Sequence, residues 1–244
     1  MQLNATKTYY MLFFTSPELQ HISLAASTGK VSSTVSFKYL GIWFDSYLNF
    51  ETHCEKLIAK VKSKLYILLR YPRSRNWQER RILFFAHIHP LFLYGIECYL
   101  HCSSSMRQRL ERLYRKCARI VLGFSAEGEL SIYCRLHILP LRFLFQLRTA
   151  ILMFRTLICK DIPTFADFFH YLHGKRHSID LILPQVHSER SRKRIQYWGA
   201  KLWNSIPSLI RNSSSLACFT SSYELHLYSK INEFKDDYNL YDFA

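Results

Sequence analysis

The sequence predicts a mainly α-helical protein with a small β region at its N-terminal end. Long stretches of helical apolar spacing begin at His53, whereas residues typical of strands are concentrated in the first fifty positions. Only 7 glycines and 7 prolines occur in 244 residues, which suits long helices with few tight turns. Because 49% of the residues are apolar, the chain can build a core, which excludes extensive disorder and collagen-like structure.

The first fifty residues carry the strand signals. Residues 7–14 are rich in aromatic and β-prone residues, and residues 21–24 form a second short candidate strand. Residues 27–33 read as a turn-rich linker, and residues 35–44 alternate and then run apolar as a third strand. Three strands without a covering helix would make an incomplete sheet.

From His53 onward the spacing is helical. Thr52 is the expected N-cap, with Glu55 as its capping-box partner, and Pro72 ends the helix. One apolar stripe runs along this helix and consists of Cys54, Leu57, Ile58, Val61, Leu65 and Leu68. Further helices are expected over residues 77–89, 90–102, 106–122, 130–137, 141–159, 198–205 and 219–235. The chain therefore divides into a β region (1–52), a helical region (53–163) and a C-terminal region (164–244).

The positive charge is concentrated in one block. The net charge is +15, and residues 53–120 hold fifteen Lys and Arg against four Asp and Glu, a net +11. Residues 223–244 instead form an acidic tail. Pairing within the block cannot neutralise such an excess, so we expect contact with a polyanion, although a merely solvated helix surface is the alternative.

Two rows of basic side chains are spaced to lie along helix faces opposite an apolar stripe, and both are candidate nucleic-acid-binding residues. They are Lys56, Lys60 and Lys64, and Arg109, Arg112, Lys116 and Arg119. In the second helix the apolar stripe consists of Leu110, Leu113, Cys117 and Ile120. Such rows can contact phosphates and position a duplex without reading its bases.

The seven cysteines suggest reduced thiols. The number is odd and no C-x-x-C occurs, so we expect mostly buried, unpaired cysteines in an intracellular protein, cytoplasmic or nuclear. No signal peptide is recognisable at the N-terminus. The one stretch resembling a membrane span, residues 83–100, contains His87, His89 and Glu97, so no membrane association is expected.

Two metal-site patterns can be drawn, and both are disfavoured. His53-Cys-Glu55 and His187-Ser-Glu189 each spell half of an iron facial triad, but along one helix the two side chains of the first diverge. A zinc pattern of unusual spacing could combine His87, His89, Cys98 and Cys102, among residues typical of a core. We therefore expect no metal site.

Four segments carry a resemblance to one known family. Asn4 and Lys7 stand in an Asn-x-x-Lys-Thr pattern before an apolar stretch. The second segment is Phe37-Lys-Tyr-Leu-Gly-Ile-Trp-Phe-Asp45, followed by Leu48, Phe50 and His53. The third holds Pro90, Leu93, Tyr94 and Gly95, and the fourth runs from Trp198-Gly-Ala-Lys-Leu-Trp to Pro207, with Phe219 beyond it. Together they resemble the reverse transcriptases of non-LTR (LINE-type) retrotransposons, over nearly the whole chain.

This resemblance implies the end of a polymerase palm, a helical thumb-like bundle and a C-terminal region. It makes Tyr39, Leu40 and Gly41 a primer-grip-like junction, and Asn4 and Lys7 a palm-remnant motif. It also implies a thumb that holds RNA, RNA–DNA or DNA duplex by the backbone.

The sequence departs from the family at the catalytic centre. RNA-directed DNA polymerases hold two Mg²⁺ ions with palm aspartates in an aromatic-x-Asp-Asp hairpin. The one matching string, Phe234-Lys-Asp236-Asp237, lies in the acidic tail without strand signals, and Asp45 alone cannot build a two-metal site. We therefore expect no catalytic residues, no cofactor (Mg²⁺ would serve only an intact parent polymerase) and no enzymatic activity in the isolated chain.

Three functions remain open from the sequence. The first is a truncated reverse transcriptase that retains sequence-independent nucleic-acid binding. The second is a helical protein-interaction module derived from a mobile element, whose basic face meets an acidic protein surface. The third is a non-functional pseudogene product. The oligomeric state is not indicated by the residues.

Overall fold

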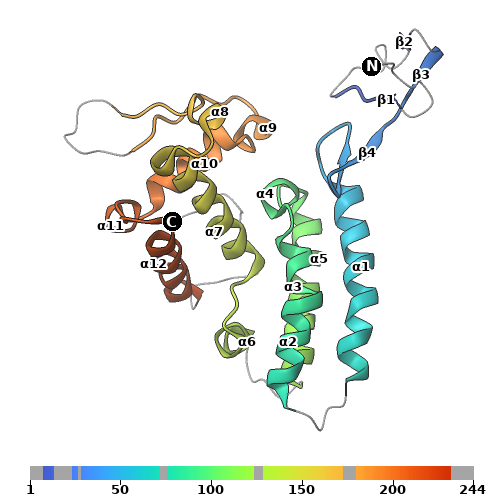
Figure 1. Cartoon of the computed structure of the whole chain (residues 1–244), viewed down its shortest axis with the longest axis vertical. Coiled ribbons are helices and arrows are strands. Elements are labelled where there is room, and N and C mark those ends of the chain that lie inside the picture. Colours follow the sequence, from blue (N-terminus) through green and yellow to red (C-terminus); the bar gives the residue numbers. More distant parts are fainter. Residues whose placement is uncertain are drawn as a thin grey trace.

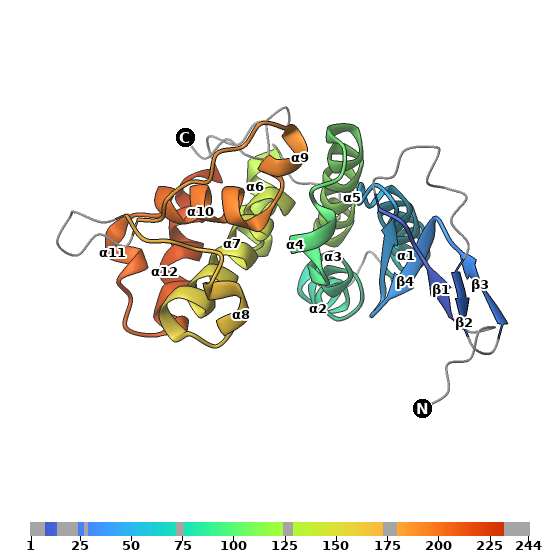
Figure 2. The same cartoon turned by 90° about the horizontal axis from the view of Figure 1, so that it is seen from above.

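The computed structural model describes residues 8–13, 24–26, 29–71, 76–123, 129–172 and 180–231. It is mainly helical with a few short strands, as the sequence predicts. Viewed from above, the strands and α1 (Glu51–Arg70) lie at one end of the molecule, the helices α2 to α5 in the middle, and α6 to α12 at the other end (Figures 1 and 2).

The three N-terminal strands are β1 (Tyr9–Tyr10), β2 (Leu24–Ala26) and β3 (Gly29–Ser33). Their order is β1-β3-β2, with β3 parallel to β1 and antiparallel to β2. The expectation of a linker is therefore wrong for residues 29–33, because Gly29–Ser33 pairs with strands on both sides. Residues 27 and 28 lie outside the described residues. Val31 is buried, yet it lies outside the buried core, which begins at Phe50.

A hairpin replaces the single strand expected over residues 35–44. It consists of β4 (Ser36–Tyr39) and β5 (Ile42–Asp45), which pair in antiparallel register. Leu40 and Gly41 form the two-residue turn with φ of 45° and 88°. Positive φ at both turn residues matches the twist of paired strands, and glycine adopts it without steric cost. The sequence did not predict this turn because Leu40 is an apolar residue, which is not typical of turns.

The long helices α1 and α5 (Ser104–Leu122) carry the apolar stripes that the sequence predicts, since every stripe residue is buried in both. The start of α1 differs from the prediction. The helix begins at Glu51 after Phe50, which has φ 57°, and the Asn49 side chain accepts a hydrogen bond from the Glu51 amide at 3.0 Å. Thr52 therefore lies inside the helix and is not the N-cap.

The middle helices are more broken than expected. α2 (Trp77–His87) is followed by α3 (His89–Leu93) and α4 (Ile96–Tyr99), where the sequence predicted one helix over residues 90–102. Gly95 separates α3 from α4 with a left-handed φ of 67°. Most residues of this stretch are apolar, so it gives no periodicity from which the break could be located.

The C-terminal part begins with α6 (Glu129–Leu136) and α7 (Leu141–Phe154), and α7 ends in a π-helical turn, Arg155–Cys159. The remaining helices are α8 (Pro163–Ala166), α9 (Glu189–Arg192), α10 (Ile195–Ser205), α11 (Ser208–Arg211) and α12 (Leu216–Ser229). Helix α12 starts three residues before the expected position, since Ser215 is its N-cap and accepts a hydrogen bond from the Cys218 amide at 3.2 Å. Residues 232–235 lie outside the described residues.

Aromatic side chains fill the core of the C-terminal part. Phe145 stacks on Trp198 at 4.6 Å between ring centroids, and Phe154 stacks on Phe219 at 4.4 Å. Trp203 is fully buried against the second pair. This packing joins α7, α10 and α12, and it explains why the aromatic residues of the fourth segment are spaced as they are.

The expectation of mostly buried cysteines is wrong. All seven are unpaired thiols, but only Cys54, Cys102 and Cys117 are buried. The others lie on exposed helix positions, which spacing along the sequence did not indicate.

Candidate nucleic-acid interface

Helix α5 presents one strongly basic face to solvent. The side chains of Arg109, Arg112, Lys116 and Arg119 are all exposed. Successive residues of a helix are about 100° apart, so the four positions fall within about 80° of one another, on the side that the buried residues of α5 leave free. The structure thus brings all four members of the predicted α5 row to one face, which we call the α5 basic face.

Contacts on its inner side fix the rotation of α5. Glu111 is buried and accepts hydrogen bonds from the Tyr133 hydroxyl of α6, at 2.6 Å, and from the Leu141 amide at the start of α7, at 3.0 Å. A carboxylate at a helix N-terminus is favoured by the helix dipole. Because Glu111 and the other buried residues of α5 are held inward, the four basic side chains lie on the exposed side of the helix.

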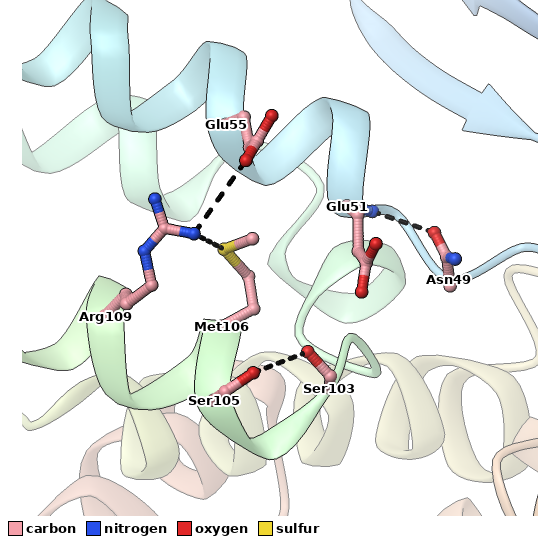
Figure 3. Close-up of polar contacts among 7 residues, drawn as sticks. All are labelled: Asn49, Glu51, Glu55, Ser103, Ser105, Met106 and Arg109. Atoms are coloured by element: carbon pink, nitrogen blue, oxygen red, sulfur yellow. Dashed lines mark hydrogen bonds and ion pairs between the residues drawn. The ribbon is translucent and has the colours of Figure 1, made fainter.

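Helix α1 lies beside α5, and the first turns of the two helices are at the same end of the pair. Figure 3 shows Arg109 of α5 reaching across to Glu55 of α1, at 3.8 Å between the guanidinium and carboxylate atoms. The same Arg109 nitrogen lies 3.7 Å from the Met106 sulfur. Both charged side chains are more than half exposed, so the pair marks the seam between the helices and contributes little stability.

The seam carries further basic side chains that the sequence reasoning missed. Lys62 lies seven residues after Glu55, as Lys116 lies seven residues after Arg109, and seven residues bring a helix back to nearly the same side. Beyond Lys62 on the same flank, Arg70 lies over the Tyr66 ring at 4.4 Å, and both are exposed. The i, i+4, i+8 spacing of Lys62, Tyr66 and Arg70 was a readable signal.

The other predicted row starts on a different flank of α1. Lys56 lies over the Trp43 ring of β5 at 4.3 Å, whereas the adjacent Glu55 meets α5. Lys60 is exposed and Lys64 is half-buried. The lysine row therefore begins beside the β4–β5 hairpin and does not continue the α5 basic face.

Of the residues expected to form a primer-grip-like junction, Tyr39 ends β4, and Leu40 and Gly41 form the hairpin turn. Tyr39 and Leu40 are 60% and 73% exposed, and the Tyr94 hydroxyl donates a hydrogen bond to the Leu40 carbonyl. Gly95 lies against Ile42, since a Cβ at position 95 would stand 2.4 Å from the Ile42 Cδ1. The second and third segments of the resemblance are thus packed together. Asn4 and Lys7, which the resemblance makes a palm-remnant motif, lie outside the described residues.

The metal patterns do not converge. His53 is buried and accepts a hydrogen bond from the Trp43 amide through Nδ1, at 3.3 Å, and burial lowers its pKa. Glu55 points instead to α5. His89 shares a 2.9 Å hydrogen bond with the Tyr114 hydroxyl, and burial lowers the pKa of His89 to about 4.

The remaining members of these patterns are also placed apart. Cys98 is exposed, whereas Cys102 is buried. His187 lies in the loop before α9, Glu189 is the first residue of α9, and both are exposed. Within the described ranges, no group of three or more His, Cys, Asp or Glu side chains gathers in a way that could hold a metal ion.

Asp45 has a structural role in the described part of the chain. Its Oδ1 accepts hydrogen bonds from the Tyr47 and Asn49 amides, at 3.2 and 2.9 Å, and so shapes the loop that leads into α1. Asp236 and Asp237 lie outside the described residues.

Comparisons with known proteins do not identify a family for this chain. No family model, no curated protein and no solved structure matches this chain. Among the helices that the structure describes, none is both long enough and apolar enough to cross a bilayer.

Proposed function

We propose that this chain is a thumb-like portion of a LINE-type reverse transcriptase and binds nucleic-acid duplex through the α5 basic face, without reading its sequence. The observation that supports the proposal is the outward row of four cations on one 19-residue helix. Lys62 and Arg70 extend this cationic surface across the seam onto α1. Phosphates are the partners that such a row of cations fits, and phosphate contacts carry no sequence information.

The test is binding of RNA–DNA, DNA and RNA duplexes of unrelated sequences over a range of salt concentrations, measured by fluorescence anisotropy. If about four phosphates are engaged, the logarithm of the affinity for DNA should fall with log salt with a slope of roughly −3 to −4. Replacing Arg112, Lys116 and Arg119 by Gln should weaken all sequences alike and flatten the slope.

A matched control removes the same charge from another flank. The triple variant Lys56→Gln, Lys60→Gln and Lys64→Gln should bind nearly as the wild type does, because that row begins beside the hairpin. Equal losses from the two triple variants would attribute binding to net charge alone. An unchanged affinity and slope in the α5 variant would contradict the proposal.

The proposed role is binding without polymerisation. We expect no primer extension on a primed RNA template with Mg²⁺, because the sequence lacks the aspartate pair outside its acidic tail. Extension that survived Asp236→Asn with Asp237→Asn would contradict this expectation. A salt-insensitive complex with an acidic protein, in place of duplex binding, would favour the protein-interaction module.

A further inference from the structure

A cavity of about 650 Å³ lies between the loop that leads into α1 and the segment that leads into α10. Its volume is in the range of sites that hold small molecules. The lining comes from segments far apart in the sequence: Leu48 and Phe50 before α1, His101 before α5, and Lys193 and Arg194 before α10. None of these residues belongs to the α5 basic face.

One wall of the cavity is cationic. Lys193 and Arg194 line it, and among its described lining residues Glu189 is the single acidic side chain. Phe50 and Arg194 are the N-caps of α1 and α10, helices of 20 and 11 residues. The positive ends of two helix dipoles therefore add to the charge of the two side chains.

His101 is a buried residue of the cavity lining. Its ring packs edge-on against Phe145 and Trp198, at 5.2 and 5.1 Å between centroids. Burial, with the charges of Lys193 and Arg107 acting in the same direction, lowers the pKa of His101 to about 3. Burial is the larger cause, and the smaller effect of the two cations has the direction expected near a site that attracts an anion.

The part of the lining that comes from the loop before α1 is mainly apolar and preformed. Tyr47, Leu48 and Phe50 belong to it, and Tyr47 is 54% exposed. Asp45 holds the loop through the Tyr47 and Asn49 amides, and its carbonyl accepts from the Leu48 amide at 2.9 Å. An exposed aromatic ring on a fixed loop can stack with a planar base.

We propose that this cavity binds a nucleotide phosphate monoester, with the phosphate at Lys193 and Arg194 and the base against Tyr47. The same chemistry is offered by a free mononucleotide and by the 5′-phosphorylated end of a strand. The site is separate from the α5 basic face, so the two proposals stand or fall independently.

The first experiment measures binding to the full chain by calorimetry. AMP and UMP should bind, whereas adenosine and inorganic phosphate should bind much more weakly, because each makes only half of the contacts. Lys193→Gln with Arg194→Gln should weaken AMP about tenfold or more, and Tyr47→Ala should weaken it severalfold. Lys160→Gln, an exposed change outside the cavity, is the control and should have no effect.

A second experiment separates the two sources of the ligand. A short 5′-phosphorylated oligonucleotide that binds more tightly than AMP, with a preference over its 5′-hydroxyl form, would identify a strand end. Equal affinity of AMP and the oligonucleotide would identify a mononucleotide site. The α5 triple variant should leave AMP binding unchanged, and the cavity variants should leave the salt slope of duplex binding unchanged.

The NMR signal of the His101 ring, assigned with His101→Gln, provides a readout in the unmodified protein. It should shift on addition of AMP, because the phosphate changes the potential at the buried ring. The proposal is overturned if neither AMP nor the 5′-phosphorylated oligonucleotide binds at about 1 mM. It is equally overturned if AMP binds with no shift of His101 and no loss in the cavity variants.

Discussion

The two β regions of the chain are built from similarly short strands but differ in their relation to the helical core. The β4–β5 hairpin packs against it through Ile42 and Phe44. The three-stranded sheet has buried Val31, which lies outside that core. The hairpin also gains the Trp43–His53 hydrogen bond and the Tyr94 contact at its turn.

This difference shows what attaches a strand to a helical bundle. Strand-forming residues are present in both regions, so propensity does not decide the outcome. The hairpin differs from the sheet because it packs against the turn between α3 and α4, where Gly95 leaves room for the Ile42 side chain. The hairpin should therefore share the stability of the helices, and the sheet should not. Four predictions test this contrast.

The largest effect is expected from Trp203→Ala in the helical core. Trp203 is fully buried, and its removal should lower the free energy of unfolding by about 4 kcal/mol. Urea denaturation measures the loss, and hydrogen exchange should show the Trp43 amide losing protection with the helices. Exchange at Val31 should not change. Leu209→Ala, at an 87% exposed position, is the control and should cost less than about 0.5 kcal/mol.

Acid should affect the core in a defined pH window. The pKa of His89 is lowered from 6.5 to about 4, so the unfolded chain takes up this proton at a higher pH than the folded chain does. Stability should therefore fall as the pH drops from 6.5 to 4, by up to about 3 kcal/mol from this group. His89→Gln should give a flatter dependence in denaturation measured across this range, and an equally steep one would contradict the assignment.

Gly95→Ala should detach the hairpin from the helices. An alanine at φ 67° costs about 1–2 kcal/mol, and its Cβ would also collide with Ile42. We expect faster exchange at the Trp43 amide with little change in α7 or α10. Adding Ile42→Val, which removes the colliding methyl, should restore part of the protection. Full protection in the single variant would show that the hairpin is held by other contacts.

The smallest effect is expected from Val31→Ala. Because Val31 lies outside the core, the global free energy of unfolding should change by less than about 1 kcal/mol. Exchange should become faster in β3 alone. A loss as large as that of Trp203→Ala would place the three-stranded sheet within the cooperative unit and remove the contrast.

Amphipathic helices were the part of the fold that the sequence could predict. The apolar stripes of α1 and α5 repeat at helical spacing, so the sequence itself indicates which side of each helix is buried. The hairpin turn was missed because Leu40 is an apolar residue at positive φ, where sequence rules expect Gly, Asn or Asp. The break at Gly95 was missed because most of its neighbours are apolar and show no helical spacing.

The candidate interface could be predicted only in part for a related reason. Spacing alone identified the α5 row, because four cations on one helix share a face whatever the helix packs against. It could not show that Glu55 faces α5 while Lys56 faces Trp43, since that depends on which helix lies on which flank. The spacing of Lys62, Tyr66 and Arg70 could be read from the sequence, but their place beside the α5 basic face follows only from the packing of α1 against α5.

The parallel packing of α1 and α5 has a consequence for how the chain emerges from the ribosome. Two helices that run in the same direction need a return path, and here α2, α3 and α4 provide it (Figure 1). The apolar stripe of α1 thus stays partly uncovered until Leu122 has been made, about 3–10 s after Arg70 at ordinary elongation rates. During synthesis, this stripe is the segment of α1 that a chaperone would recognise.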